Sequence, residues 1–203
     1  GYNWDDGDVE YCINMATVKS NFFKVAGIVG DNHQGNVRYS YNVGDIINTE
    51  IDDGSEEATD NRFGGIAGKN RPGCIVSDCY NTGTILIQQE GLLAAETNVM
   101  TRVRTQYVGG IVGSVNNNAC SVVRCYSVGV INFTENHYAT EWLKKFNNTT
   151  SYEGGIGGVV GKDTVGSATI TNCYYNADHV LLTNNIGTML TTNAMLFTAN
   201  NNM

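Results

Sequence analysis

The sequence predicts an all-β fold, a repeat β-solenoid with inserted loops and one short helix, within a single domain over residues 1–203. Three observations predict it: an internal repeat, alternation of apolar and polar residues inside the copies, and 24 Gly and 26 Asn against a single Pro. Glycine and asparagine accept positive φ more readily than other residues, so this composition favours many tight turns. Short strands joined by turns are therefore expected along most of the chain.

The repeat occurs as four full copies and one partial copy. The full copies cover 25–46, 63–85, 108–131 and 156–180, and a half copy at 9–18 matches the back half of the others. Each full copy opens on a motif of the type Gly-Gly-apolar-x-Gly, in which the second glycine is Gly27, Gly65, Gly110 and Gly158. We expect a short strand here, with glycines that lack a packed side chain or turn a corner at positive φ.

The back half of the copies supplies columns of equivalent residues. An apolar column contains Val9, Val37, Val76, Val122 and Ile170, and a second column contains Cys12, Ser40, Cys79, Cys125 and Cys173. The next position holds Ile13, Tyr41, Tyr80, Tyr126 and Tyr174, and a closing column holds Val18, Ile46, Ile85, Ile131 and His179. No single copy has enough apolar side chains to close its own core. Stacked copies, with strands about 4.8 Å apart, would bury the apolar and cysteine columns in one interior.

Three inserts separate the copies, at 47–62, 86–107 and 132–155, and a tail follows at 181–203. The first insert is acidic and is expected to be a solvated loop or hairpin. In the third, Tyr138, Trp142 and Phe146 recur at i, i+4 and i+8, which predicts a short amphipathic helix. We expect these aromatics to pack mainly onto the solenoid, with their rim as the candidate contact for a partner. All three inserts follow the closing column, so they should emerge on one side.

The copies resemble the GLUG-motif repeat proteins. The signature of that family, Gly-Gly-hydrophobic-x-Gly followed by an alternating strand, Cys/Ser-Tyr-Asn and a glycine turn, is matched almost letter for letter from Phe63 to Ile85. Departures are Ala26 for the first glycine, Ser40 in the cysteine column and Ala177 for the last turn glycine. The resemblance implies a surface-exposed, non-catalytic module of the kind found in bacterial adhesin-like proteins and in accessory regions of IgA-specific metallopeptidases. It supplies no catalytic residue to carry over.

The sequence offers no catalytic, cofactor-binding or metal-binding constellation. The six cysteines form no CxxC pair and no zinc-like spacing with histidine, and neither HExxH nor GxSxG occurs. A ladder of buried free thiols is favoured over disulfides between successive copies, which stay an alternative. Within a copy, the five-residue spacing of Cys74 and Cys79 predicts that the two side chains lie on opposite faces of one strand.

Composition narrows the classes of partner. Twelve basic against twenty acidic side chains give a net charge of -8, which argues against nucleic acid. No apolar stretch approaches the roughly 18 residues that span a bilayer, so membrane insertion is not expected. The first residues lack the features of a signal peptide, and Gly1 without a methionine suggests a trimmed piece of a longer protein.

These observations lead to a functional expectation: a structural or adhesive module of a bacterial cell-surface or secreted protein, extracellular, binding a host or matrix protein or glycan. One alternative is an accessory region of a secreted peptidase. A polysaccharide-active β-helix enzyme is less favoured, because the position before the cysteine column holds no column of carboxylates. That position is Tyr11, Tyr39, Asp78, Arg124 and Asn172.

Overall fold

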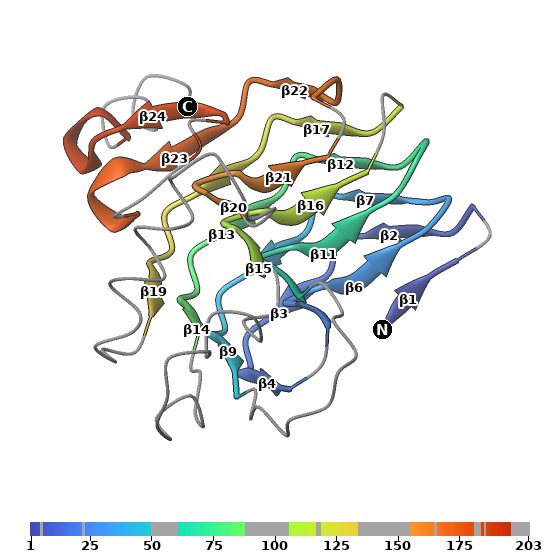
Figure 1. Cartoon of the computed structure of the whole chain (residues 1–203), viewed down its shortest axis with the longest axis horizontal. Helices are drawn as coiled ribbons and strands as arrows, with labels where there is room; N and C mark the ends of the chain where they lie inside the picture. Colours follow the sequence, from blue (N-terminus) through green and yellow to red (C-terminus); the bar gives the residue numbers. More distant parts are fainter. Residues whose placement is uncertain are drawn as a thin grey trace, which may run out of the picture.

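The computed structural model describes residues 1–4, 6–21, 23–49, 61–87, 106–116, 119–133, 155–164, 166–180, 184 and 186–195 (Figure 1). Strands dominate these residues, with a 3-10 helix η2 (Ala177–His179) and one helical turn at 192–195 as the helical segments among them. The predicted all-β class is confirmed. The helix expected around Tyr138, Trp142 and Phe146 lies outside the described residues.

The strands form five sheets, here numbered in the order in which one copy visits them. Sheet 1 contains β5 (Lys24–Ala26), β10 (Asn61–Gly64), β15 (Gln106–Gly109) and β20 (Gly155–Gly157). Sheet 2 contains β1 (Tyr2–Asn3), β6 (Val29–Asn32), β11 (Ala67–Asn70), β16 (Val112–Val115) and β21 (Val160–Asp163). Sheet 3 contains β2 (Asp8–Glu10), β7 (Asn36–Arg38), β12 (Ile75–Ser77), β17 (Ser121–Val123) and β22 (Thr169–Thr171).

The last two sheets complete each copy. Sheet 4 contains β3 (Ile13–Asn14), β8 (Tyr41–Asn42), β13 (Tyr80–Asn81), β18 (Tyr126–Ser127), β23 (Tyr174–Asn176) and β24 (Thr188–Leu190). Sheet 5 contains β4 (Val18–Ser20), β9 (Ile46–Asn48), β14 (Ile85–Ile87) and β19 (Ile131–Phe133). The sequence colours of Figure 1 pass in order from strand to strand across these sheets, so consecutive copies lie side by side.

All strand pairs are parallel, and the register matches the sequence columns. Val37, Val76 and Val122 pair with one another, as do Ile46, Ile85 and Ile131. The Ile66 N–H donates to the Ile111 carbonyl and the Ile111 N–H to the Val159 carbonyl, each at 2.9 Å, so these three residues are stacked as expected. In the part of the chain that the structure describes, no sheet closes on itself. The solenoid therefore remains our interpretation of the stacked parallel copies.

Both ends of the stack differ from the repeat seen in the sequence. The first copy contributes four strands, because β1 pairs with β6 ahead of the expected half copy. In the last copy, Val180 rather than His179 forms the bridge to Ile131, so the expected place of His179 in the closing column is wrong. The physical reason is η2, whose turn adds one residue before the chain reaches sheet 5.

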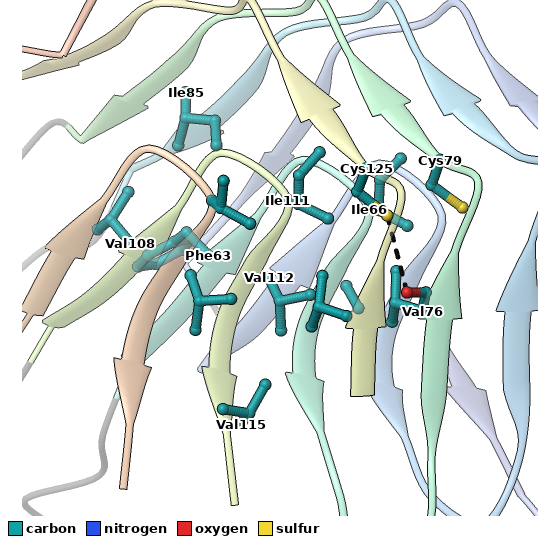
Figure 2. Close-up of a cluster of buried hydrophobic side chains, with 14 of the residues drawn as sticks. Phe63, Ile66, Val76, Cys79, Ile85, Val108, Ile111, Val112, Val115 and Cys125 are labelled. Carbon is teal, nitrogen blue, oxygen red and sulfur yellow. Dashed lines mark hydrogen bonds between the residues drawn. The ribbon is translucent and has the colours of Figure 1, made fainter. Parts of the chain in front are cut away.

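The interior contains the central members of the columns that the sequence assigned to it, whereas Val9, Val18 and Ile170 at the ends of the stack are only partly buried. Ile66, Ile111, Val159, Val76 and Val122 have no exposed surface. Figure 2 shows the Ile, Val and Phe side chains side by side on successive strands, with the Cys125 thiol bonded to the Val76 carbonyl of the neighbouring copy at 3.7 Å. Each apolar side chain therefore contacts its equivalents in the copies before and after it.

The second glycine of each motif forms a corner, whereas the first and last motif positions lie in the strands on either side of it. Gly65 lies in a bend between β10 and β11, and among the described glycines only Gly73, Gly166 and Gly187 have positive φ. The requirement for glycine comes from close approach instead. A Cβ on Gly65 would collide with the Gly110 carbonyl oxygen and with the side chain of Asn81, which packs across the corner. Of the two expected roles of the motif glycines, a turn at positive φ is therefore wrong, and the absence of a side chain is what the corner requires.

Asparagine side chains form two ladders that run from copy to copy. Asn14 Nδ2 donates to Asn42 Oδ1 at 2.6 Å, and Asn42 Nδ2 donates to Asn81 Oδ1 at 2.8 Å. In sheet 2, Asn3, Asn32 and Asn70 are joined in the same way at 2.8 Å per step. Each amide also donates to a carbonyl in the turn that follows it, as Asn42 does to Gly44 at 2.7 Å. The ladders satisfy amides that would otherwise be buried without partners.

Candidate functional site

Side chains that face the solvent recur in two places in the repeat. One is the outward face of sheet 4, and the other is the corner between sheets 3 and 4. The corner residues all adopt left-handed backbone conformations, with φ between 49° and 55°. They are Tyr11, Tyr39, Asp78, Arg124 and Asn172. Non-glycine residues rarely adopt this conformation, so a column of five marks a corner that the stacking imposes on the chain.

Neighbouring corner residues contact one another along the stack. The rings of Tyr11 and Tyr39 are stacked with centroids 5.2 Å apart. One step further, Arg124 forms a bidentate ion pair with Asp78, with Nε–Oδ1 at 2.6 Å and Nη2–Oδ2 at 2.7 Å. The hydrogen bonds from Arg124 lower the pKa of Asp78. The corner thus combines an aromatic pair and a charged pair on one exposed edge.

Replacing Arg124 with glutamine is expected to lower the urea midpoint only slightly, because exposed ion pairs contribute little to stability. Asp78 has a lowered pKa in the folded chain, so the pair's contribution is present above the unfolded-state pKa and is lost as pH falls through the folded one. The urea midpoints of the wild type and of Arg124→Gln, measured between pH 7 and pH 2, should therefore converge at the acid end. A difference between the midpoints that stays constant over this range would show that it does not come from the ion pair with Asp78.

Three tyrosines, Tyr41, Tyr80 and Tyr126, form what we call the outer tyrosine row. They pair in register on β8, β13 and β18, and the next residue on each strand is buried, which turns the tyrosines outward. Ring centroids are 4.6 Å apart between Tyr41 and Tyr80 and 5.0 Å apart between Tyr80 and Tyr126. The ring planes differ by 6° and 5°.

This geometry decides what the row can bind. Each shared ring face is covered by the neighbouring ring, so the row presents ring edges and hydroxyl groups rather than flat platforms. Burial raises the pKa of Tyr80 and of Tyr126, so both phenols stay protonated at neutral pH and can donate hydrogen bonds. The row is suited to hydrogen bonding and edge contacts with a partner surface.

The cysteines are free thiols, as expected for a ladder of thiols without disulfides, and five of the six are buried. The single S–H donors of Cys79, Cys125 and Cys173 each have two carbonyl acceptors within hydrogen-bonding distance, one in the preceding copy and one in their own copy. Hydrogen bonding with Cys173 and Cys79, together with burial, raises the pKa of Cys125. The thiols therefore act as small buried hydrogen-bonding groups.

The expectation that the two cysteines of one copy lie on opposite faces of a strand is wrong. Cys74 and Cys79 are 0% and 1% exposed, and Val76 between them is buried as well. The left-handed conformation of Asp78 interrupts the strand alternation, so the residue after it turns inward again. The period-two argument was wrong here because the strand ends at Ser77.

A thiol reagent applied to the folded protein should titrate Cys12 and reach the other five cysteines only after unfolding, because Cys12 alone is partly exposed. Absorbance titration without and with urea measures the number of thiols that react in the folded and in the unfolded protein. In the matched variant Cys12→Ser, the native titration should fall to near zero. Rapid reaction of most thiols in the native chain would show that the cysteine column is not interior.

The sequence-predicted contact residues Tyr138, Trp142 and Phe146 lie outside the described residues. Their insert follows β19, and the other two follow β9 and β14. The final residues of these three strands, Asn48, Ile87 and Phe133, are neighbours in sheet 5. The described ends of the inserts therefore share one side of the stack, in line with the expectation.

Over the described ranges, no three His, Cys, Asp or Glu side chains come together in a way that could hold a metal ion. No helix in the same residues is long and apolar enough to cross a bilayer. Comparisons of the chain with protein-family models, with curated proteins and with solved structures give no match. The resemblance to GLUG-motif repeats thus stays an interpretation of the motif residues.

Proposed function

We propose that the chain is a non-catalytic, structural or adhesive repeat module of a bacterial cell-surface or secreted protein, working outside the cell. The observation that supports it most is the different use of the two faces. Inward asparagines, cysteines and glycines contact their own equivalents, whereas the outward positions of sheet 4 repeat as tyrosines at strand spacing. A surface repeated in this way suits contact with an extended partner.

The partner class in this proposal is a host or matrix protein or a glycan. Tyrosines are enriched where proteins bind one another, because one ring supplies both apolar area and a polar hydroxyl group. The outer tyrosine row is one candidate surface. The rim of the insert residues Tyr138, Trp142 and Phe146 is the other, on the basis of their aromatic spacing.

The test is solid-phase binding of the purified chain to matrix glycoproteins and to a panel of host glycans. The double variant Tyr80→Ser, Tyr126→Ser should weaken binding at least about tenfold, as loss of interface tyrosines commonly does. Trp4→Ser removes an exposed aromatic from another part of the molecule and serves as the matched control. Deletion of 135–150 should abolish binding while the β-rich circular dichroism spectrum is retained.

The outcomes separate the alternatives. Binding that neither the double variant nor the deletion weakens would refute both proposed surfaces. Hydrolysis of a glycan or a peptide by the purified chain would refute the non-catalytic assignment and favour the enzyme reading.

A further inference from the structure

A cluster of cations occupies the junction of sheets 1 and 2, in a chain whose net charge is -8. We call Lys24, Arg62, Lys69 and Arg71 the cationic cluster. Lys24 and Arg62 are register neighbours on β5 and β10. Lys69, on β11, lies in register between Asp31 and Ser114. Arg71 follows β11 directly, where its N–H donates to the Asn32 carbonyl at 3.0 Å.

One carboxylate serves two of the four cations. Asp31 has a side chain that is 1% exposed, and its oxygens accept from Lys24 Nζ at 2.7 Å and from Arg71 Nε and Nη2 at 2.9 and 2.7 Å. Arg62 Nε donates to Ser114 Oγ at 2.9 Å, and its guanidinium group lies 5.4 Å from the centre of the Tyr107 ring. Among the described residues of this junction, four positive charges therefore lie around the one negative charge of Asp31.

Lys69 is the member of the cluster whose ammonium group makes no hydrogen bond to any residue in the described part of the chain. It is partly buried, and cross-strand neighbours on one face of a sheet lie about 5 Å apart, so it stands between the Asp31 and Ser114 side chains. Burial and the charges of Arg62, Arg71 and Lys24 lower the pKa of Lys69 to about 8, against the opposing effect of Asp31.

An anion bound beside Lys69 would supply the missing acceptor and would offset the repulsion between Lys69 and the neighbouring cations. Oxyanions suit the donors best, since ammonium and guanidinium groups form their strongest hydrogen bonds to carboxylate, sulfate or phosphate oxygens. The chain as a whole has a net charge of -8, so its overall field repels a long polyanion more strongly than a compact ligand with one isolated charge. The ammonium group of Lys24 lies 5.6 Å from the ring centre of Tyr2. Tyr2 is 69% exposed and can contact a neutral part of the same ligand.

We propose that the cationic cluster binds the oxyanion of an acidic glycan, a uronic carboxylate or a sulfate ester, and that Lys69 is the residue that contacts it. This names the ligand class within the proposed binding function and rests on it. The measurement, however, is made in solution with small ligands, so it can fail or succeed independently of adhesion to a matrix surface.

The probes are methyl glucuronide and glucose 6-sulfate, titrated into the full chain and followed by NMR chemical-shift changes at low salt. Methyl glucoside is the neutral control, and acetate and inorganic sulfate separate a free-anion site from a sugar site. The acidic sugars should bind more tightly than the free anions. Lys69→Gln should weaken their binding by roughly tenfold to a hundredfold, as expected for a hydrogen bond to a charged group. Lys19→Gln, an exposed lysine in sheet 5, should leave it unchanged.

A second readout separates a binding residue from a structural one. Lys69→Gln removes a repelled charge, so it should raise the thermal midpoint by roughly 2–4 °C near pH 7. In the wild type, stability should rise between about pH 8 and the unfolded-state pKa of lysine, because there the unfolded chain binds a proton that the folded chain does not. The charged groups around Lys69, namely Lys24, Asp31, Arg62 and Arg71, are present in the wild type and in Lys69→Gln. The difference in the pH dependence of stability between the two proteins therefore reports the titration of Lys69.

Four results would overturn the proposal. These are unchanged binding in Lys69→Gln, equal affinity for methyl glucoside, preference for a penta-glutamate peptide over the acidic sugars, and a lower thermal midpoint in Lys69→Gln. Binding that appears only when the acidic residues of 50–60 are replaced by amides would also overturn it, because the occupant would then be the chain itself.

Discussion

Replacing Ile111 with alanine is expected to lower the free energy of unfolding by about 2–5 kcal/mol. Ile111 has no exposed surface and lies in a central copy. Its carbonyl accepts from the N–H groups of Ile66 and Ala67, and its own N–H donates to Val159. Because the backbones on both sides are fixed by these bonds, the neighbouring side chains cannot move in to fill the cavity.

Urea unfolding monitored by circular dichroism measures this loss. The matched control is Ile75→Ala, which removes the same atoms from a side chain that is 39% exposed and should cost only about 0.5 kcal/mol. Similar losses in the two variants would show that the stacked interior does not carry the stability of the fold.

Replacing Gly65 with alanine should cost at least about 3 kcal/mol or prevent folding, because the added methyl group meets backbone that cannot move. The Gly110 carbonyl oxygen occupies the space where the Cβ would lie, and Asn81 occupies the rest of it. Moving Asn81 would break the bond that it accepts from Asn42. One methyl group therefore disturbs a corner, a neighbouring copy and an amide ladder together.

Gly73→Ala is the control for this variant. Gly73 has φ of 80° and no atom within 4 Å of an added Cβ, so the cost should be the 1–2 kcal/mol or so of a left-handed alanine. Failure of Gly65→Ala to fold, or a much lower urea midpoint, meets the expectation. A midpoint equal to that of Gly73→Ala would contradict the close-approach explanation.

The repeat columns predicted the interior well because stacking places equivalent residues in register. Val37, Val76 and Val122 needed only to be aligned, and the same holds for Ile66, Ile111 and Val159. Single-sequence arguments failed where the backbone leaves regular geometry. Asp78 ends the period-two alternation in a left-handed conformation, and η2 shifts the closing column by one residue, so Cys74 and His179 were misplaced.

Features that depend on contacts between copies could not be deduced from composition. The asparagine excess predicts turns, yet among the described asparagines only Asn172 has positive φ. The signal that was available is the recurrence of asparagine at Asn14, Asn42 and Asn81, each one residue after the outward column. The cationic cluster gave no such signal, because Lys24, Lys69 and Arg71 come together only through pairing of β5, β6, β10 and β11.

The asparagine ladders also give the stack an electrical direction. Because the turn carbonyls can only accept, each amide must point its Nδ2 toward them, which leaves Oδ1 to face the preceding copy. Every amide dipole in both ladders is therefore aligned with the next, as peptide dipoles are in a helix, and mutual polarisation strengthens the bonds. The oxygen end of this alignment lies at Asn3 and Asn14, so the first copy presents a partial negative charge and the later copies a partial positive one. A single reversed amide would place two oxygens face to face, so each ladder favours one orientation for all of its amides.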